Sequence, residues 1–304
     1  CTLNTDIFNH SYYIAQKTKD AIVDQFRKKY NRRPSVDTEL PTLRINIHIS
    51  REDVNVSLDS SGSSLHKRGY REVAGMAPMN EVLAAGIILL TGWHPRRRLI
   101  DPMCGSGTIP IEAALYANNI PPGYFRKKFG FELWNDFEPE LWEKITDSAL
   151  DRISNEMQDV TALEISEATL KIAQENILRA KVEDVIKTIH ADFFEWIPPE
   201  GTGMLIMNPP YGERLDTDDS LAFYKQIGAT LKKNYNGYDA WLISSNIEAI
   251  HEIGLRPSRK ITLFNGPLEC RLLKYEMYAG TKKIHKLRSE NGGRREEEGE
   301  LRTE

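Results

Sequence analysis

The residues of this chain that are best suited to chemistry are Asn208, Pro209, Pro210 and Tyr211, which directly follow the apolar run Met204–Met207. A short apolar run bounded by turn residues is typical of a buried strand, so the four residues are expected at a strand end. The Asn208 side-chain oxygen and the Pro209 carbonyl can each accept an N–H, while the Tyr211 ring can stack on a flat base. The combination predicts a site that orients an exocyclic amino group of a nucleobase toward a small electrophile. The structural alternative is that the two prolines merely end a strand and Tyr211 packs on the core.

A second chemical signal is the glycine pair Gly105 and Gly107, placed between a predicted strand at 98–100 and a predicted helix at 109–117. Two glycines let the backbone turn sharply and let a ligand approach it closely. The N-terminus of the following helix favours a carboxylate or a phosphate. The loop lacks the nucleoside-triphosphate pattern, and Pro110 stands where a dinucleotide fingerprint needs its third glycine. A purely structural turn remains the alternative for this loop taken alone.

Acidic residues follow the next two predicted strands and narrow the ligand class. Glu164 ends a strand at 160–164, where a carboxylate can accept both hydroxyls of a ribose. Asp192 and Phe193 follow a strand at 186–190, where one can accept from an adenine amino group and the other can stack on the ring. A ligand with a carboxylate, a ribose and an adenine but no phosphate is S-adenosylmethionine, which carries a transferable methyl group.

Strands and helices alternate through most of the chain, which predicts an α/β fold with a mostly parallel, twisted, Rossmann-like sheet covered by helices on both faces. The last two predicted strands, at 261–264 and 270–278, are expected to form an antiparallel pair. Before this region, a helix at 11–30 and a hairpin at 43–58 predict a small α+β module. Met79 and Met103 are expected to fill the core.

Composition argues against a membrane-spanning protein, a disulfide-stabilised protein and a metal-binding protein. The chain has 304 residues, a net charge of −4 and no apolar stretch long enough to span a bilayer. Its three cysteines have neither disulfide nor metal-ligand spacing, so no metal and a reducing cytoplasm are expected. Basic clusters, among them Arg27–Lys29 and Arg126–Lys128, leave room for a local nucleic-acid surface on a net-acidic protein. The sequence does not address the oligomeric state.

Two longer motifs carry a family resemblance, the segment Asp101–Thr108 and the segment Asn208–Leu215, and the segments Leu65–Arg71 and Phe264–Cys270 look like the same family. Together they resemble THUMP-containing class I RNA methyltransferases, most of all the bacterial large-subunit ribosomal RNA guanine-N2-methyltransferases. The resemblance implies a Rossmann-like catalytic domain that binds S-adenosylmethionine, and a THUMP-like RNA-binding region before it. The residues implied for the cofactor are Asp101, Cys104, Gly105, Ser106, Gly107, Thr108, Glu164, Ile165, Ser166, Asp192, Phe193 and Asn208, and those implied for the target amine are Asn208, Pro209, Pro210 and Tyr211.

The predicted domains are a partial THUMP-like region at 1–62, a methyltransferase domain at 63–281 with an insertion at 118–156, and a charged tail without fixed structure at 282–304. The predicted function is methyl transfer to an exocyclic amine of a base in RNA, with guanine N2 of ribosomal RNA first. Three alternatives stay open: adenine N6 in DNA, guanine N2 in transfer RNA, and a non-catalytic RNA-binding protein.

Overall fold

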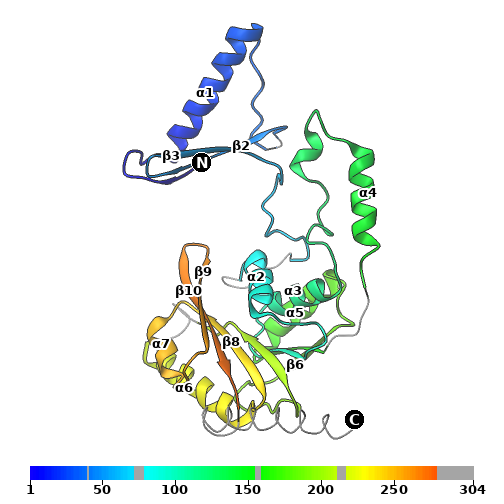
Figure 1. Cartoon of the computed structure of the whole chain (residues 1–304), viewed down its shortest axis with the longest axis vertical. Coiled ribbons are helices and arrows are strands. Elements are labelled where there is room, and N and C mark those ends of the chain that lie inside the picture. Colours follow the sequence, from blue (N-terminus) through cyan, green and yellow to red (C-terminus); the bar gives the residue numbers. More distant parts are fainter. Residues whose placement is uncertain (40, 72–78, 155–158, 211–216, 279–304) are drawn as a thin grey trace, which may run out of the picture. The chain divides into compact units, whose positions relative to one another are not determined.

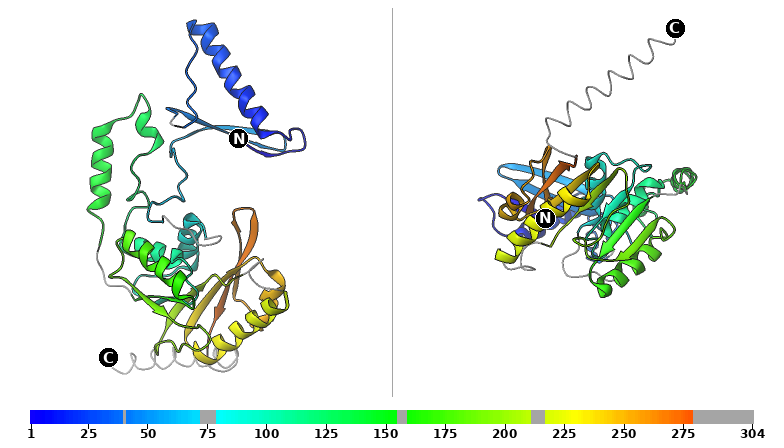
Figure 2. Two further views of the ribbon diagram at one scale, coloured as in Figure 1. Left: turned by 180° about the vertical axis from the view of Figure 1, so that it is seen from behind. Right: turned by 90° about the horizontal axis from the view of Figure 1, so that it is seen from below.

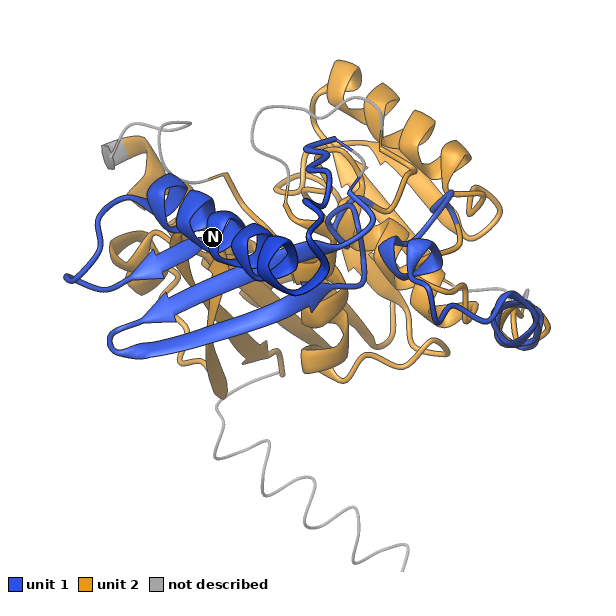
Figure 3. Cartoon of the chain, turned by 90° about the horizontal axis from the view of Figure 1, so that it is seen from above, with its two compact units in different colours: residues 1–67, 125–148 blue, residues 68–124, 149–304 orange. Residues whose placement is uncertain are grey.

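The chain forms two compact units, which are coloured separately in Figure 3. A computed structural model describes residues 1–39, 41–71, 79–154, 159–210 and 217–278. The first unit comprises residues 1–67 together with 125–148, and the second comprises residues 68–124 and everything after 148. The segment 125–148, expected within an insertion in the methyltransferase domain, therefore groups with the N-terminal residues. The predicted tail at 282–304 lies outside the described residues.

The first unit has a three-stranded sheet with the order β1-β2-β3 (β1 Thr2–Asn4, β2 Arg44–Ser50, β3 Asp53–Asp59). Strand β2 pairs with β1 in parallel and with β3 as the predicted antiparallel hairpin. The unit also contains α1 (Ser11–Tyr30), the short 3-10 helix η1 (Gly130–Leu133) and α4 (Pro139–Leu150). Around Arg126, the Nη2 atom donates to the carbonyls of Ser61 (2.9 Å) and Ser63 (2.8 Å). The Phe131 N–H donates to the Ser60 carbonyl (2.9 Å), so two segments far apart in sequence are joined.

The second unit is built on a seven-stranded sheet with the order β6-β5-β4-β7-β8-β10-β9 (Figure 1). The strands are β4 Leu99–Asp101, β5 Val160–Glu164, β6 Ile186–His190, β7 Gly203–Met207, β8 Tyr238–Ser244, β9 Arg259–Asn265 and β10 Leu268–Glu276. Strands β4 to β8 pair in parallel, and only β10 runs antiparallel to its neighbours β8 and β9. This confirms the predicted mostly parallel sheet with an antiparallel C-terminal strand.

The helices of this unit lie on both faces of the sheet, as the β-α alternation predicts (Figure 2). They are α2 Glu81–Thr91, α3 Thr108–Ala117, α5 Glu167–Arg179, α6 Thr217–Asn234 and α7 Ile247–Glu252. Tyr224, Ile227 and Leu231 of α6 pack with β7, β8 and β10 in a single buried cluster. Every residue of β7 is buried, which explains why Gly203–Met207 reads as a continuous apolar run rather than an alternating one.

Four elements were not predicted from the sequence: β1, η1, α4 and α7. Strand β1 has three residues and α7 has six, which is too few to show a period. None of the described helices is long and apolar enough to cross a membrane.

Candidate active site

A cavity of about 470 Å³ opens at the carboxyl ends of β4, β5, β6 and β7. In a parallel sheet this is the edge where ligands bind, because loops from successive strands converge there. Its volume lies in the range of small-molecule sites. The lining residues are Met79, Asp101, Pro102, Met103, Cys104, Gly105, Ser106, Thr108, Ile109, Glu164, Ile165, Thr169, Ile172, Ala191, Asp192, Phe193, Phe194, Asn208, Pro210 and Phe223.

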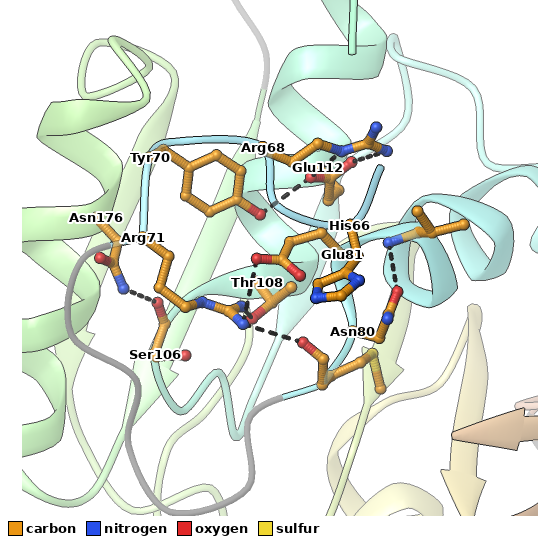
Figure 4. A network of polar contacts seen from close by, with 12 residues as sticks. His66, Arg68, Tyr70, Arg71, Asn80, Glu81, Ser106, Thr108, Glu112 and Asn176 are labelled. Atoms are coloured by element: carbon orange, nitrogen blue, oxygen red, sulfur yellow. Dashed lines mark hydrogen bonds and ion pairs between the residues drawn. The ribbon is translucent and has the colours of Figure 1, made fainter. Parts of the chain in front are cut away.

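The loop between β4 and α3 is held by hydrogen bonds along its length. The Met103 N–H donates to Asp101 Oδ1 (3.2 Å), and the Gly105 N–H donates to Glu164 Oε2 (3.0 Å). Asn176 Nδ2 of α5 donates to the Ser106 carbonyl (3.0 Å, Figure 4). Gly105 has φ +55°, and a Cβ there would meet no protein atom within 4 Å. The loop is therefore fixed while its Gly105 position stays open, as a cradle for a ligand requires.

The acidic side chains at the ends of β5 and β6 have the predicted placement. Both Glu164 oxygens accept backbone N–H groups, Oε2 from Gly105 and Oε1 from Ser166 (3.0 Å each). A carboxylate has about four acceptor positions, so Glu164 keeps capacity for ribose hydroxyls. Asp192 Oδ1 accepts from the Phe194 N–H (2.8 Å). Ile165 is 64% exposed and lines the cavity, so it offers an apolar surface beside both acids.

Asp101 is the most strongly perturbed acid of the cavity. It is 1% exposed, and burial, aided by the negative charge of Glu164, raises its pKa to about 8. Burial also raises the pKa of the Cys104 thiol, to which the charges of Asp101 and Glu164 add. The surroundings of Cys104 therefore favour the neutral thiol over the thiolate.

The acceptor side of the cavity is formed by Asn208 and Pro210, directly after β7. The Asn208 Oδ1 atom is buried and accepts no hydrogen bond from any residue that the structure describes. Because an unsatisfied buried acceptor is costly, its presence in a cavity wall points to a donor on a ligand. Pro209 does not line the cavity, and Tyr211 lies outside the described residues.

Other predicted site residues have different surroundings. Gly107 is the N-cap of α3 with φ +84°, and Ser166 is the N-cap of α5, where its hydroxyl accepts from the Thr169 N–H (3.3 Å). Neither lines the cavity. Phe193 does line it but is only 3% exposed, and its ring packs against Tyr235 with centroids 5.6 Å apart. Stacking of Phe193 on adenine stays a prediction.

Several lining residues were not singled out as site residues from the sequence. Met79 and Met103, assigned to the core, reach the cavity wall. Phe223 comes from α6, and its ring meets Phe194 edge to face with centroids 5.2 Å apart. The only sequence signal for Phe194 was its position beside Phe193. Phe223 lies in a helix, and the sequence alone does not show that this helix packs beside the cavity. Among the described residues, no group of three or more His, Cys, Asp or Glu could hold a metal ion.

Family models match both parts of the chain. Residues 68–274 match the model described as RMKL-like, methyltransferase domain, and residues 3–59 match the THUMP domain. The first match covers most of the second unit and contains the whole cavity.

Relatives of known name agree with these models. A protein of Synechocystis sp. named as a proposed RNA methyltransferase is 40% identical, over 91% of this chain and 73% of its own length. The ribosomal RNA large subunit methyltransferase K/L of Methylococcus capsulatus is 41% identical over 88% of this chain. The chain spans only 37% of that longer relative.

Three solved structures whose sequences are 30–34% identical to this chain show the same fold. A possible methylase from Clostridium difficile 630 has a TM-score of 0.81 and 34% identity, covering 92% of this chain and 74% of that one. SMU.472, described as a methyltransferase in complex with SAH, has a TM-score of 0.78 and 30% identity, covering 92% and 75%. A predicted N6-adenine-specific DNA methylase from Listeria monocytogenes has 0.74 and 32%, covering 85% and 67%. The chain belongs to the RMKL-like methyltransferase family, with a THUMP domain ahead of its methyltransferase domain.

Proposed function

We propose that this protein is an S-adenosylmethionine-dependent RNA methyltransferase that modifies an exocyclic amino group, with guanine N2 of large-subunit ribosomal RNA as the first target. The buried, unsatisfied Asn208 Oδ1 in the cavity wall carries the proposal. The THUMP match and the names of the K/L relatives support RNA as the substrate class.

The cofactor fits the donor and acceptor groups of the cavity. Glu164 would accept from the ribose hydroxyls, Asp192 from the adenine amino group, and the Gly105–Thr108 turn would receive the carboxylate end. When bound, S-adenosylmethionine supplies an electrophilic methyl group. The open Cβ position of Gly105 is the observation that favours a ligand at this turn.

Asn208 would orient the acceptor amine. The lone pair of a guanine or adenine amino nitrogen is delocalised into the ring and is weakly nucleophilic. Asn208 Oδ1 can accept one N–H, and the carbonyl of the neighbouring Pro209, which is outside the cavity lining, would have to accept the other; the two acceptors together take the lone pair out of conjugation with the ring. Orientation of this kind can supply up to ~7–11 kcal/mol of barrier reduction. Asn208 is neutral and takes no proton, so the proton released from the amine passes to water.

Replacing Asn208 separates these roles. We expect Asn208→Ala to reduce methyl transfer to RNA by at least about 100-fold, because the amine loses its acceptor, while cofactor affinity stays within about threefold. The measurement is incorporation of labelled methyl groups into unmodified ribosomal RNA, alongside calorimetric titration with the cofactor. The matched control is Asn234→Ala at the end of α6, away from the cavity lining, which should keep full activity. Near-normal turnover in Asn208→Ala would remove its proposed role.

Nucleoside analysis identifies the target. Digestion of the methylated RNA and mass spectrometry should give N2-methylguanosine. The second candidate, adenine N6 in DNA, is favoured by the similarity to the Listeria methylase. N6-methyladenine in DNA with no methylated guanine in RNA would establish that candidate instead.

A further inference from the structure

Arg71 belongs to a buried polar network beside the cofactor loop that the mechanism above does not use (Figure 4). Its side chain is 11% exposed and forms an ion pair with Glu81 (Nη1 to Oε1, 3.4 Å). Nη1 also donates to the Met79 carbonyl (3.3 Å), and Nη2 donates to the Thr108 hydroxyl. Met79 and Thr108 both line the cavity, so one guanidinium joins two parts of its wall.

The hydrogen bond to Thr108 fixes the direction in which that hydroxyl can donate. A threonine hydroxyl has one proton to donate and two lone pairs to accept with. Arg71 can only donate, so it occupies a lone pair of Oγ1 and turns the hydroxyl proton away from the guanidinium. No acceptor among the described residues takes that proton. The Thr108 hydroxyl can therefore donate to an acceptor on a ligand in the cavity.

The backbone around Thr108 adds further donors. Thr108 and Ile109 are the first two residues of α3, whose N–H groups have no partner within the helix. The N-cap is Gly107, which has no side chain to satisfy them, and the first turn contains no acidic residue. This end of the cavity therefore offers N–H and O–H donors at the positive end of a helix dipole.

We propose that Arg71 is a positioning residue that makes Thr108 a donor to the carboxylate of the cofactor's methionine moiety. Arg71 acts through the Thr108 hydroxyl, and its charge is already paired with Glu81. The inference rests on the cofactor class and is independent of which base is methylated.

Two ligands that differ in the carboxylate test this. S-adenosylhomocysteine has the amino-acid moiety, and 5′-methylthioadenosine lacks it while keeping the nucleoside. We expect Arg71→Met and Thr108→Val each to weaken S-adenosylhomocysteine binding by roughly tenfold or more, the usual range for a lost hydrogen bond to a charged group. Binding of 5′-methylthioadenosine should change less than about twofold. The readout is the dissociation constant from calorimetric titration.

Coupling between the two residues is the second readout. If Arg71 acts through the Thr108 hydroxyl, the double variant should bind S-adenosylhomocysteine about as weakly as either single variant. Thr108→Ser keeps the hydroxyl and should retain the affinity. Additive losses, or equal losses for both ligands, would overturn the proposal.

Arg68→Met is the matched control for removing a buried arginine. Arg68 pairs with Glu112 (3.3 Å) in the middle of α3 and does not line the cavity. The Arg68→Met variant should have a lower melting temperature, but the ratio of the dissociation constants for S-adenosylhomocysteine and 5′-methylthioadenosine should not change. If Arg71→Met does not fold, two other variants decide the question: Arg71→Lys, which retains a donor, and Thr108→Val. Intact S-adenosylhomocysteine affinity in Thr108→Val contradicts the proposal.

Discussion

At the scale of single residues, Asp101 gives the fold a pH dependence. Its pKa is raised from 3.8 to about 8, first by burial and then by the negative charge of Glu164. Between these values the folded protein retains a proton that the unfolded chain releases. The stabilising contribution is therefore complete below about pH 4 and is lost as the pH rises toward 8.

Asp101→Asn should remove this dependence, since an amide does not ionise. We expect the free energy of unfolding of the unaltered protein to fall, relative to Asp101→Asn, as the pH is raised from 4 to 8. Urea denaturation of both proteins at several pH values measures their free energies of unfolding. A constant difference between them across this window would show that the Asp101 pKa is not raised.

Individual residues of the cavity wall were predictable where chemistry and strand position coincide. Glu164, Asp192 and Asn208 each stand at or just after a strand end, and all three line the cavity. The sequence motif Leu65–Arg71 contains Arg71, but its contact with Thr108 was not predictable, because Thr108 lies 37 positions further along the chain. Such a contact depends on how the segment before α2 packs, which no local pattern encodes.

At the scale of elements, the contact of α6 with α7 depends on a glycine. A Cβ on Gly228 of α6 would lie 1.9 Å from the Ile253 carbonyl oxygen, far inside van der Waals contact. Gly86 of α2 has no protein atom within 4 Å of the same position. The two helical glycines therefore differ in packing while sharing the same helical backbone.

Replacing each glycine by alanine should give opposite results. Gly228→Ala should lower the free energy of unfolding by about 1–3 kcal/mol through overpacking. Gly86→Ala should raise it by about 0.5–1 kcal/mol, because alanine loses less entropy in a helix. Denaturant unfolding measures both. Equal signs for the two variants would contradict the packing described here.

Most elements of the second unit could be predicted because their patterns are strong. Strands β7 and β8 are apolar runs of a fully buried parallel sheet, and α2 has its cap residues Asn80 and Gly92. Helix α4 was missed although Leu141 and Ile145 stand four residues apart, as on one face of a helix. It lies in a segment whose length suggested an irregular insertion, and its aliphatic residues Leu141, Ile145 and Leu150 are exposed rather than buried.

At the scale of the whole molecule, the net charge of −4 hides local basic segments. The last turn of α1 contains Arg27, Lys28 and Lys29, with the Lys29 ammonium 5.1 Å from the centre of the Tyr30 ring. This helix belongs to the unit that matches a THUMP domain. If RNA contacts this helix, phosphate neutralisation should be visible in the salt dependence of binding.

The double variant Lys28→Gln with Lys29→Gln tests the basic turn. RNA affinity should fall, and the slope of log affinity against log salt should shrink by about 0.7 for each lost phosphate contact. Cofactor affinity should not change, because the cavity belongs to the other unit. Filter binding at several salt concentrations measures the slope. Lys171→Gln, whose lysine is paired with Glu167 (2.9 Å), serves as the control. An unchanged slope in the double variant would exclude this turn from the RNA surface.

The assembly of the first unit from two separate stretches has a consequence for biosynthesis. When residue 67 leaves the ribosome, Arg126 and Phe131, which bond to Ser60, Ser61 and Ser63, have not yet been translated. By the time residue 148 emerges, β4 and α3 of the second unit are already outside. The first unit therefore receives its last residues after part of the second unit has already emerged. A stalled product ending near residue 100 would contain β1, β2 and β3 without the segment 125–148 that belongs to the same unit.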